Sequence, residues 1–412
     1  MSLDFQQLTT DIEKMARAAG GRNVTRQTLL DEVLLFLHNN ANAWDALEDA
    51  YQTIVTEVLQ ATSARPYRGS ARALNPQGAP LDAIIEQSPA GLPPKATIIS
   101  VDGSQIVPDR HAPYVYYLLN TGGIVYYHGS AVAPEIFSTP HLKFPDEHDL
   151  SDSRFSNPTS VSIERDQAEM EELARQSVAN RGQDGPLLAI MDQRLLYVPI
   201  GDLAPQFKEK VIKEWQLGMT TIKNAGGLLV GYIDRPAKSS VLTMLYQIHP
   251  EWSAEEPDSL GGWEGLTDAD LFSKLLGPGA RSIVFADVSH ANTRFKKEKR
   301  HNEVCFFYLN TSQLPGEENA NIARVDLPMW VAEDEMAVQM VHELIADQCK
   351  ILGRYPYVLT RADEMAVVGK QDQAELEFRI GRMMDRYGVQ FGSTAKQLTK
   401  DIARGGQRTH EM

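Results

Sequence analysis

The stretch Ala-Thr-Ile-Ile-Ser-Val-Asp-Gly-Ser at residues 96–104 indicates the fold class of this chain. It is rich in apolar and β-branched residues, as buried strands are, and its apolar part ends at Asp102. The segment Leu187–Met191 is a second apolar run, and it also ends at an aspartate, Asp192. Because open α/β sheets bind ligands beyond the carboxyl ends of their strands, we expect both carboxylates at one functional site.

Strand-like and helix-like segments alternate along the rest of this region. A hairpin is expected from residues 115–119 and 124–127, because Asn-Thr-Gly-Gly lies between them. A loop is expected at 138–160. The periodicity further predicts strands at 228–233, 282–288, 304–309 and 323–327, and helices at about 161–180, 204–224, 334–352 and 371–387. This alternation is typical of an α/β fold with a mixed sheet and flanking helices.

The two ends of the chain differ from this core. Residues 1–62 carry apolar stripes with helical spacing, interrupted at Gly20-Gly21. They predict a helical N-terminal extension that either packs on the rest of the chain or forms a partner or dimer surface. Residues 63–95 are rich in Pro, Gly, Ser and Ala, which favours a linker. We also expect an acidic insertion at about 250–280 and a basic tail at 396–412.

The composition excludes several classes of protein. The 412 residues include 40 basic and 55 acidic side chains, and the net charge of −15 argues against nucleic-acid binding by bulk charge. The two cysteines fit a reducing compartment. The amino terminus lacks the layout of a signal peptide, and no apolar run approaches the roughly 18 residues of a membrane span. We therefore expect a cytoplasmic protein that does not associate with a membrane.

The paired carboxylates point to a metal site. Asp102 and Asp192 on neighbouring strand ends cannot both stay ionised without a counter-charge, and a divalent cation is the usual one. The alternative is that each aspartate only caps the next turn. A third ligand is expected from the helix between the two strands, where spacing alone leaves Glu164, Asp166 and Glu169 open.

Other kinds of chemistry have less support. The sequence contains no Walker loop, dinucleotide-binding glycine motif, HExxH zinc motif, CxxC pair or GxSxG elbow. Asp234 also ends a strand, but Arg235 and Pro236 follow it and favour a turn with an ion pair. A sugar-kinase-like enzyme would need a second phosphate-binding glycine turn, and Gly226-Gly227 precedes a strand instead of following one.

Four motifs, in this order, resemble those of the NurA family of prokaryotic nucleases. They are Val-Asp-Gly-Ser-Gln at 101–105, Arg165-x-x-x-Glu169, the strand that ends at Asp192, and Tyr-Pro-x-x-Leu-x-x-Ala at 355–362. The resemblance spans about residues 96–370. It implies an RNase H-like nuclease domain at 96–395 that hydrolyses DNA in double-strand break repair, end resection or a related defence role.

The resemblance also assigns residues to the site. It implies that Asp102, Glu169, Asp192 and Asp363 are catalytic and hold Mn²⁺ or Mg²⁺ in a two-metal mechanism. The chain departs from the family pattern at Gln193, where the family commonly has Gly, and at Asp363, where it often has His. These departures support the alternative of a non-catalytic adaptor on a degenerate nuclease fold. If Asp363 is not a ligand, we expect it to cap a helix that begins near residue 362.

A short basic segment is the best candidate for holding DNA. Residues 294–300 contain five basic side chains and one acid, and Phe295 among them is expected to stack on a base. The expected DNA-binding residues are Arg294, Lys296, Lys297, Lys299 and Arg300. The alternative is a solvated loop. The resemblance further implies a homodimer that works with a separate HerA-type hexameric ATPase, since this chain has no ATPase motif.

Overall fold

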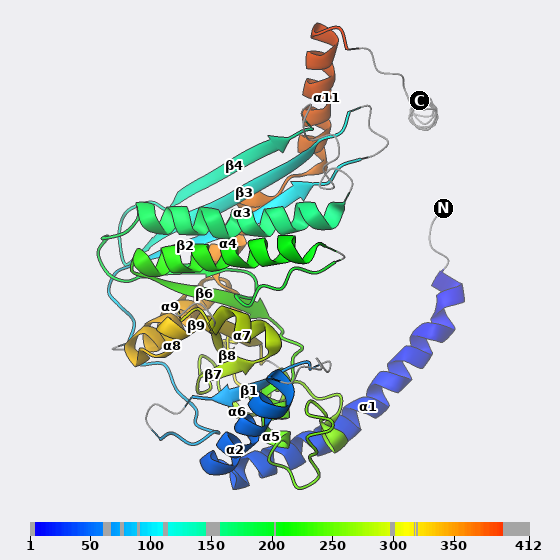
Figure 1. Ribbon diagram of the computed structural model, residues 1–412, viewed down its shortest axis with the longest axis vertical. Helices are drawn as coiled ribbons and strands as arrows, with labels where there is room; N and C mark the ends of the chain where they lie inside the picture. The colour runs from blue at the N-terminus through cyan, green and yellow to red at the C-terminus, as the bar shows by residue number, and fades with distance from the viewer. Residues whose placement is uncertain are drawn as a thin grey trace.

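A computed structural model of the chain describes residues 5–60, 67–74, 78–88, 91–109, 114–145, 157–201, 203–296, 301–316, 318 and 320–389. Their elements form a nine-stranded sheet with helices on both faces (Figure 1). The strands are β1 (Ser70–Ala73), β2 (Ala96–Ile106), β3 (Tyr117–His128), β4 (Glu135–Lys143), β5 (Leu187–Met191), β6 (Gly227–Asp234), β7 (Phe285–Val288), β8 (Val304–Asn310) and β9 (Ile322–Pro328). Across the sheet they run β1-β7-β8-β9-β6-β5-β2-β3-β4.

The helices connect these strands and extend from both ends of the described chain. They are α1 (Phe5–Asn39), α2 (Trp44–Ile54), α3 (Pro158–Ala179), α4 (Pro205–Asn224), α5 (Ser240–Tyr246), α6 (Asp268–Leu275), α7 (His290–Lys296), α8 (Met329–Ala332), α9 (Glu335–Leu352), α10 (Tyr357–Ala366) and α11 (Lys370–Arg386). A π-helical turn, Val55–Leu59, continues α2, and a short 3-10 turn spans Gly261–Trp263.

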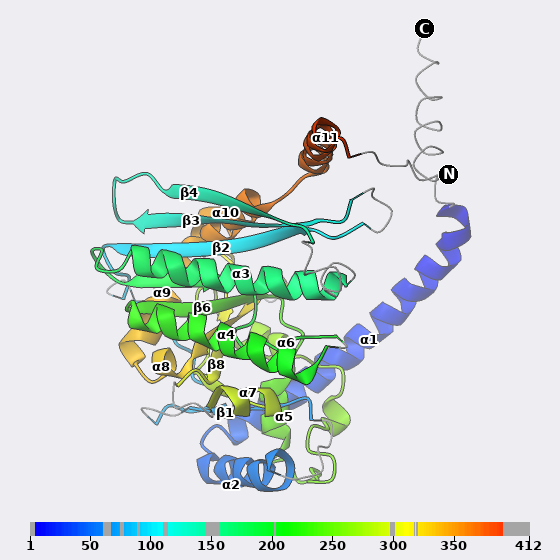
Figure 2. The same ribbon diagram turned by 45° about the horizontal axis from the view of Figure 1, so that its top comes forward.

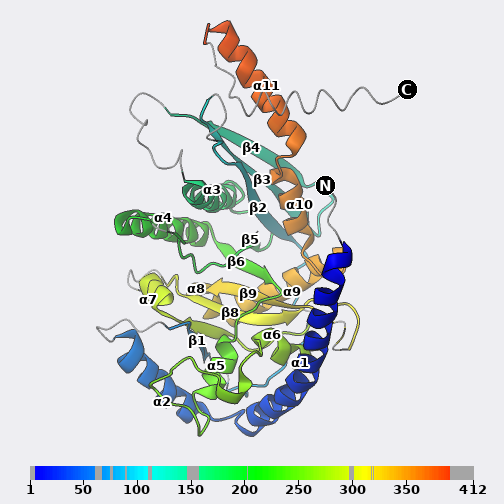
Figure 3. The ribbon, with the colours of Figure 1, turned by 90° about the vertical axis from the view of Figure 1, so that its right-hand side faces the viewer.

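The half of the sheet that carries the two strand-end aspartates has an RNase H-like order. Strands β2, β3 and β4 form an antiparallel meander, and β5 and β6 lie parallel to β2 on its other side. The crossover helices α3 and α4 pack on one face of this half, and α9 and α10 pack on the other (Figure 3). The α/β prediction with a mixed sheet and flanking helices is confirmed.

Buried strands explain why this half needs helices on both faces. Alternate residues of β5 contribute to two different cores: Leu188 and Ile190 pack toward α9 and α10, whereas Ala189 and Met191 pack toward α3 and α4. A strand that is apolar on both sides must be covered on both sides, because each exposed face would leave apolar area in water.

The other half of the sheet is antiparallel and carries the N-terminal helices. Strand β9 pairs with β6 and β8, and β7 links β8 to β1. A core beneath this half joins α1 to the acidic region, through Leu30, Val33 and Leu37 on one side and Trp263 and Leu271 on the other. The second half of α1 therefore packs on the rest of the chain.

The first half of α1 has a different environment. It runs away from the body of the molecule (Figure 2). Its apolar stripe is exposed and consists of Phe5, Leu8, Ile12 and Met15. One helix thus combines the two alternatives left open by the sequence, a packed segment and a free apolar face.

Two sequence-based boundaries in the N-terminal region were wrong. Gly20-Gly21 does not end a helix, since α1 is continuous from Phe5 to Asn39. Glycine in a helix interior costs only about 1 kcal/mol per residue, and packing of the second half of α1 offsets such a cost. The segment expected as a linker contains β1, whose residues Ser70–Ala73 pair with β7 at the edge of the sheet.

The predicted hairpin at residues 115–127 is also wrong. Residues Tyr117–His128 form one continuous strand, and the chain turns only after it to form β4, which occupies part of the expected loop at 138–160. Gly122 and Gly123 serve close packing instead of a turn. A Cβ at Gly122 would lie 2.3 Å from the backbone nitrogen of Ala366 in α10, and one at Gly123 would lie 2.4 Å from the Ser100 carbonyl oxygen.

Among the described helices, none combines the length and apolar character that a bilayer span requires.

We expect Gly122→Ala to destabilise the protein by about 1–3 kcal/mol, because the added methyl group overlaps the backbone of α10 and the helix must move. Urea unfolding measures this loss. Gly381→Ala in α11 is the matched control: no atom lies within 4 Å of its added Cβ, so its stability should be unchanged or slightly higher. Equal stability of the two variants would show that α10 does not pack this tightly on β3.

Candidate active site

The two strand-end aspartates lie level with each other. Strands β2 and β5 are parallel neighbours with Ser100 opposite Ile190, so Asp102 and Asp192, each two residues further on, continue the same register. Adjacent strands are about 5 Å apart, which places the two residues within reach of one small ligand. Successive side chains of a strand point to opposite faces, so Asp102 lies on the same face of β2 as Ile98. This is the face that α10 covers.

The candidate site is located where one strand ends and its neighbour continues. β5 stops at Met191, whereas β2 continues beside β3 as far as Ile106. Glu169 of α3 reaches this place from the opposite face of the sheet. A Cβ at Gly103 would lie only 2.5 Å from Glu169 Oε1, so a glycine is required there for the carboxylate to approach.

The structure distinguishes the three acids of α3 that the sequence left open. Glu164 accepts a hydrogen bond from the Tyr117 hydroxyl at 2.6 Å. Asp166 accepts one from the Tyr197 hydroxyl at 2.8 Å. Only Glu169 of the three is buried, with 5% of its surface exposed, and its carboxylate lies against Gly103, next to Asp102.

One oxygen of Glu169 accepts a hydrogen bond from a side chain, and the other makes only an ion pair. Arg165 Nε lies 3.1 Å from Oε1, and the same guanidinium contacts Asp166 at 2.5 Å. Gln193 Nε2 donates to Oε2 at 2.8 Å. The departure from the family pattern at Gln193 therefore contributes a hydrogen bond inside the site. Sequence reasoning missed this role because a hydrogen bond between residues 24 positions apart leaves no local signal.

Asp363 reaches the site from α10. The helix begins at Tyr357, so Asp363 lies in its second half and is not an N-terminal cap. The capping alternative is wrong. A carboxylate near a helix C-terminus is disfavoured by the helix dipole, so neither capping nor the dipole explains its position. Its charge acts on both Asp102 and Asp192 and raises the pKa of each.

The Asp192 carboxylate has a hydrogen-bond partner in the loop between α9 and α10. The Tyr355 hydroxyl donates a hydrogen bond to its carboxylate. Burial, followed by the charges of Asp234 and Asp363, raises the pKa of Asp192, and the bond from Tyr355 opposes this rise. Because part of the Asp192 side chain is exposed, water screens these effects more than at buried Glu169. In the sequence analysis Tyr355 was only part of a motif, and no role was assigned to its side chain.

Asp234 lies at the margin of this group. Asn321 Nδ2 donates to its Oδ1 at 3.2 Å, and Arg235 Nε lies 3.8 Å from its Oδ2. The ion pair that the sequence favoured is therefore present. The charge of Asp234 still acts on Asp192, which makes it a neighbour of the site.

The electrostatics of the site favour a cation. Burial raises the pKa of Asp102, the hydrogen bond from the Gly103 amide lowers it, and Asp363 and Asp192 raise it further. Burial also places the pKa of Glu169 well above the usual range, opposed by Arg165 but reinforced by Asp102. Asp102, Glu169 and Asp192 are each harder to ionise because other carboxylates are near. A bound divalent cation would remove this cost, and oxygen ligands suit Mn²⁺ and Mg²⁺.

The four carboxylates surround the end of β5 without meeting at a single point. Within the described residues, no three His, Cys, Asp or Glu side chains have the arrangement of a formed metal centre. Arg165 and Gln193 hold the Glu169 carboxylate in this structure. The donor set fits a divalent cation, and side-chain movements would be needed to complete the coordination.

The expected DNA-binding segment is only partly described. Arg294 and Lys296 are exposed on α7, whereas Lys297, Lys299 and Arg300 lie outside the described residues, as does the tail at 396–412. The expectation that Phe295 stacks on a base is wrong, because it is 1% exposed and packs in the core of α3 and α4. Arg294 and Lys296 follow β7, which runs antiparallel to β5, so they lie toward the opposite ends of the strands from Asp192.

We expect Asp102→Asn to keep or raise the stability of the protein in EDTA at neutral pH, because the change removes a charge that its surroundings disfavour. Because the pKa of Asp102 is raised in the folded state, protonation of this carboxylate stabilises the folded state. The stability of wild type relative to the variant should therefore fall as the pH rises from about 4 through the raised pKa. Thermal unfolding over this pH range measures the difference.

Asp287→Asn is the matched control for this experiment. Asp287 is a buried carboxylate whose pKa is lowered by Lys238 and Arg324 in spite of its burial, so its charge is paired. Breaking a buried pair costs about 3–5 kcal/mol, and this variant should lose stability at pH 7. A comparable loss in Asp102→Asn would show that Asp102 is also paired and does not need a cation.

Comparison with known proteins identifies the family of this chain. The sequence profile of the NurA domain matches residues 96–368. The crystal structure of the NurA nuclease from Sulfolobus solfataricus is similar, with 12% identity, a TM-score of 0.46 and coverage of 86% of this chain and 96% of that one. The catalytic domain of human Endonuclease V has 10% identity, a TM-score of 0.34 and coverage of 74% and 91%. No curated protein shows significant similarity. Because the profile covers well over half of its residues, the chain belongs to the NurA family of nucleases.

Proposed function

We propose that this NurA nuclease cleaves DNA with two divalent cations, Mn²⁺ or Mg²⁺, held by Asp102, Glu169, Asp192 and Asp363. The observation that carries the proposal is the gathering of four carboxylates around the end of β5, where neighbouring carboxylates raise the pKa of Asp102, Glu169 and Asp192. When bound, such cations lower the pKa of a water molecule and offset charge on the phosphate.

The remaining side chains orient these ligands. Gln193 donates a hydrogen bond to one oxygen of Glu169, Arg165 makes an ion pair with the other, and Tyr355 donates to the carboxylate of Asp192. Burial, Asp363 and Asp192 raise the pKa of Asp102, and the guanidinium of Arg165 opposes this rise. Orienting contacts of this kind are typical of the residues that surround metal ligands in proteins.

The proposal includes a cellular setting. A protein of net charge −15 does not hold DNA by bulk charge, so delivery of DNA by a HerA-type translocase in the cytoplasm, during end resection or a related defence process, fits the chain. The exposed stripe of α1, Phe5, Leu8, Ile12 and Met15, supports a surface for that ATPase or for a second copy of the chain. The alternative function, a non-catalytic adaptor, is favoured only by the two departures from the family pattern.

We expect Asp192→Asn to abolish Mn²⁺-dependent cleavage of linear DNA, because asparagine keeps the shape of the side chain but loses the charge that binds the cation. The measurement compares wild type and variant with Mn²⁺, with Mg²⁺ and with EDTA. Asp363→Ala should retain some activity and need more Mn²⁺ for half-maximal cleavage, since three carboxylates remain. Asp109→Asn, which alters a carboxylate outside the cluster, is the control.

Two results would contradict this assignment. Cleavage by Asp192→Asn at the wild-type rate would remove Asp192 from the site. Complete absence of cleavage by wild type, with each metal and with a HerA-type ATPase added, would favour the adaptor.

We expect Ile12→Glu to weaken dimerisation or binding of a HerA-type ATPase by about tenfold or more, because it places a charge in the exposed stripe. Sedimentation and pull-down experiments measure the two associations. Thr10→Glu, on the polar side of the same turn, is the matched control. Deleting residues 1–62 is unsuitable for this test, since Leu30, Val33 and Leu37 belong to the core. Unchanged association in Ile12→Glu would leave the stripe without this role.

A further inference from the structure

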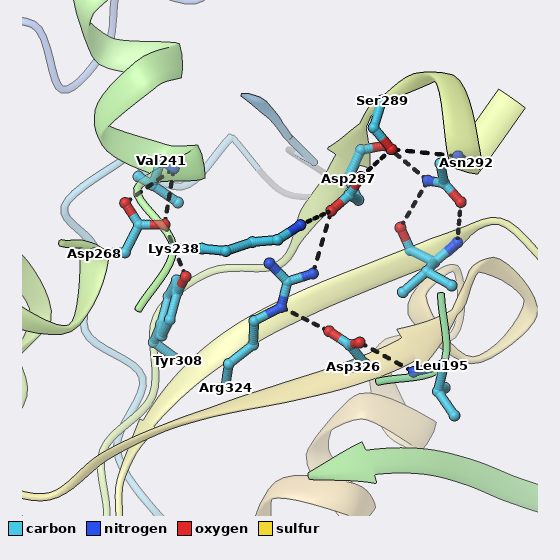
Figure 4. A network of polar contacts seen from close by, with 11 residues as sticks. Leu195, Lys238, Val241, Asp268, Asp287, Ser289, Asn292, Tyr308, Arg324 and Asp326 are labelled. Carbon is cyan, nitrogen blue, oxygen red and sulfur yellow. Dashed lines mark hydrogen bonds and ion pairs between the residues drawn. The ribbon is translucent and has the colours of Figure 1, made fainter. Parts of the chain in front are cut away.

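A buried network of charges connects the antiparallel half of the sheet to the candidate site. Arg324 of β9 lies between two carboxylates: its Nε contacts Asp326 Oδ1 at 2.7 Å, and its Nη2 contacts Asp287 Oδ2 at 3.4 Å (Figure 4). Asp287 also accepts from Ser289 at 2.7 Å and from Lys238 at 3.4 Å. Arg324, Asp287 and Asp326 are all buried.

Fold stability alone does not explain such a network. Charges are costly to remove from water, and well-packed apolar residues often replace a buried ion pair without loss of stability. The guanidinium of Arg324 stacks on Phe306 at 3.7 Å from the ring centre, so the site has apolar surroundings that would suit an apolar side chain. The specific contacts that the charged groups make therefore need another reason.

One end of the network contacts the segment that carries Asp192. The second oxygen of Asp326 accepts a hydrogen bond from the backbone amide of Leu195 at 3.2 Å (Figure 4). The carbonyl of Leu195 accepts in turn from the Trp215 indole at 2.9 Å. Both backbone groups of Leu195, three residues after Asp192, are thus fixed by buried side chains.

The same segment packs closely on the sheet beside Asp326. Gly231 of β6 pairs with Asp326, and a Cβ at Gly231 would lie 2.4 Å from the carbonyl oxygen of Gln193. Gln193 is the residue whose side chain holds Glu169. Movement of Leu195 would therefore displace both Asp192 and the hydrogen bond to Glu169.

We propose that Asp326, oriented by Arg324, is a positioning residue that fixes residues 192–195 and thereby sets the affinity of the site for a divalent cation. This inference rests on the proposed function, because it assumes that Asp192 and Glu169 bind the cation. Asp326 itself touches neither the cation nor the substrate.

Asp287 provides a matched control within the network. It is a buried carboxylate that contacts the same guanidinium, but it lies on β7 and its contacts do not include residues 192–195. If the network served only stability, removing either charge would have the same kind of effect. If Asp326 positions the segment, only its removal should loosen residues 192–195 in the folded protein.

The experiment compares Asp326→Asn, Asp287→Asn, Asp192→Asn and the apolar double variant Arg324→Met/Asp326→Leu with wild type. Hydrogen exchange in EDTA measures the opening of residues 192–197, with strand β8 as the reference for global opening. Titration with Mn²⁺, followed by electron paramagnetic resonance, measures cation affinity. The apolar double variant removes both charges together. If it does not fold, the same two measurements are made on Asp326→Asn.

We expect both Asp326 variants to exchange at least tenfold faster than wild type at residues 192–197, relative to β8, and to bind Mn²⁺ about 10–100-fold more weakly. Asp287→Asn should stay within about twofold of wild type in both readouts, even though it is less stable.

Wild-type exchange and affinity in the Asp326 variants, or equal loosening in Asp287→Asn, would overturn the inference. If the proposed function is wrong, the result is different: wild type and Asp192→Asn bind Mn²⁺ equally poorly. Hydrogen exchange at residues 192–197 still tests the positioning role in that case.

Discussion

Repulsion among carboxylates is the constraint on which the candidate site depends. Asp102, Glu169, Asp192 and Asp363 come from two strands and from helices on opposite faces of the sheet, and they gather where β5 ends while β2 continues. In the absence of a cation, burial and mutual charge raise the pKa of Asp102, Glu169 and Asp192. The surrounding structure maintains this unfavourable arrangement, which is the usual relation between a fold and its functional site.

The carboxylates of the candidate site and buried Asp287 of the antiparallel half have opposite electrostatic surroundings. In the RNase H-like half, carboxylates outnumber their cationic partners, with Arg165 as the counter-charge that contacts Glu169 directly. In the antiparallel half, Asp287 is paired with Lys238 and Arg324, and its pKa is lowered in spite of burial. In the first arrangement an external cation would offset the negative charge, whereas in the second Lys238 and Arg324 already do so. The hydrogen bond from Leu195 to Asp326 joins them.

Local signals in the sequence predicted the fold class and singled out the two strand-end aspartates, whereas Glu169 and Asp363 were assigned through the resemblance to the NurA family. A β-branched run that ends in Asp predicts a strand end, and two such runs separated by a helix predict a shared edge of a sheet. The same reasoning failed where distant packing decides. Gly122 and Gly123 have the composition of a turn, yet α10 and a neighbouring strand require them inside β3. Gln193 and Asp326 gained their roles only from contacts with residues far away in the chain.

Anomalous scattering from crystals soaked in Mn²⁺ is the most direct test of the carboxylate site, because it locates the cation without reference to activity. We expect Mn²⁺ peaks between Asp102, Glu169, Asp192 and Asp363, with the Glu169 carboxylate turned away from Arg165 or Gln193 toward the metal. Peaks elsewhere, or no peak at a Mn²⁺ concentration that supports cleavage, would contradict the assignment of these four residues as ligands.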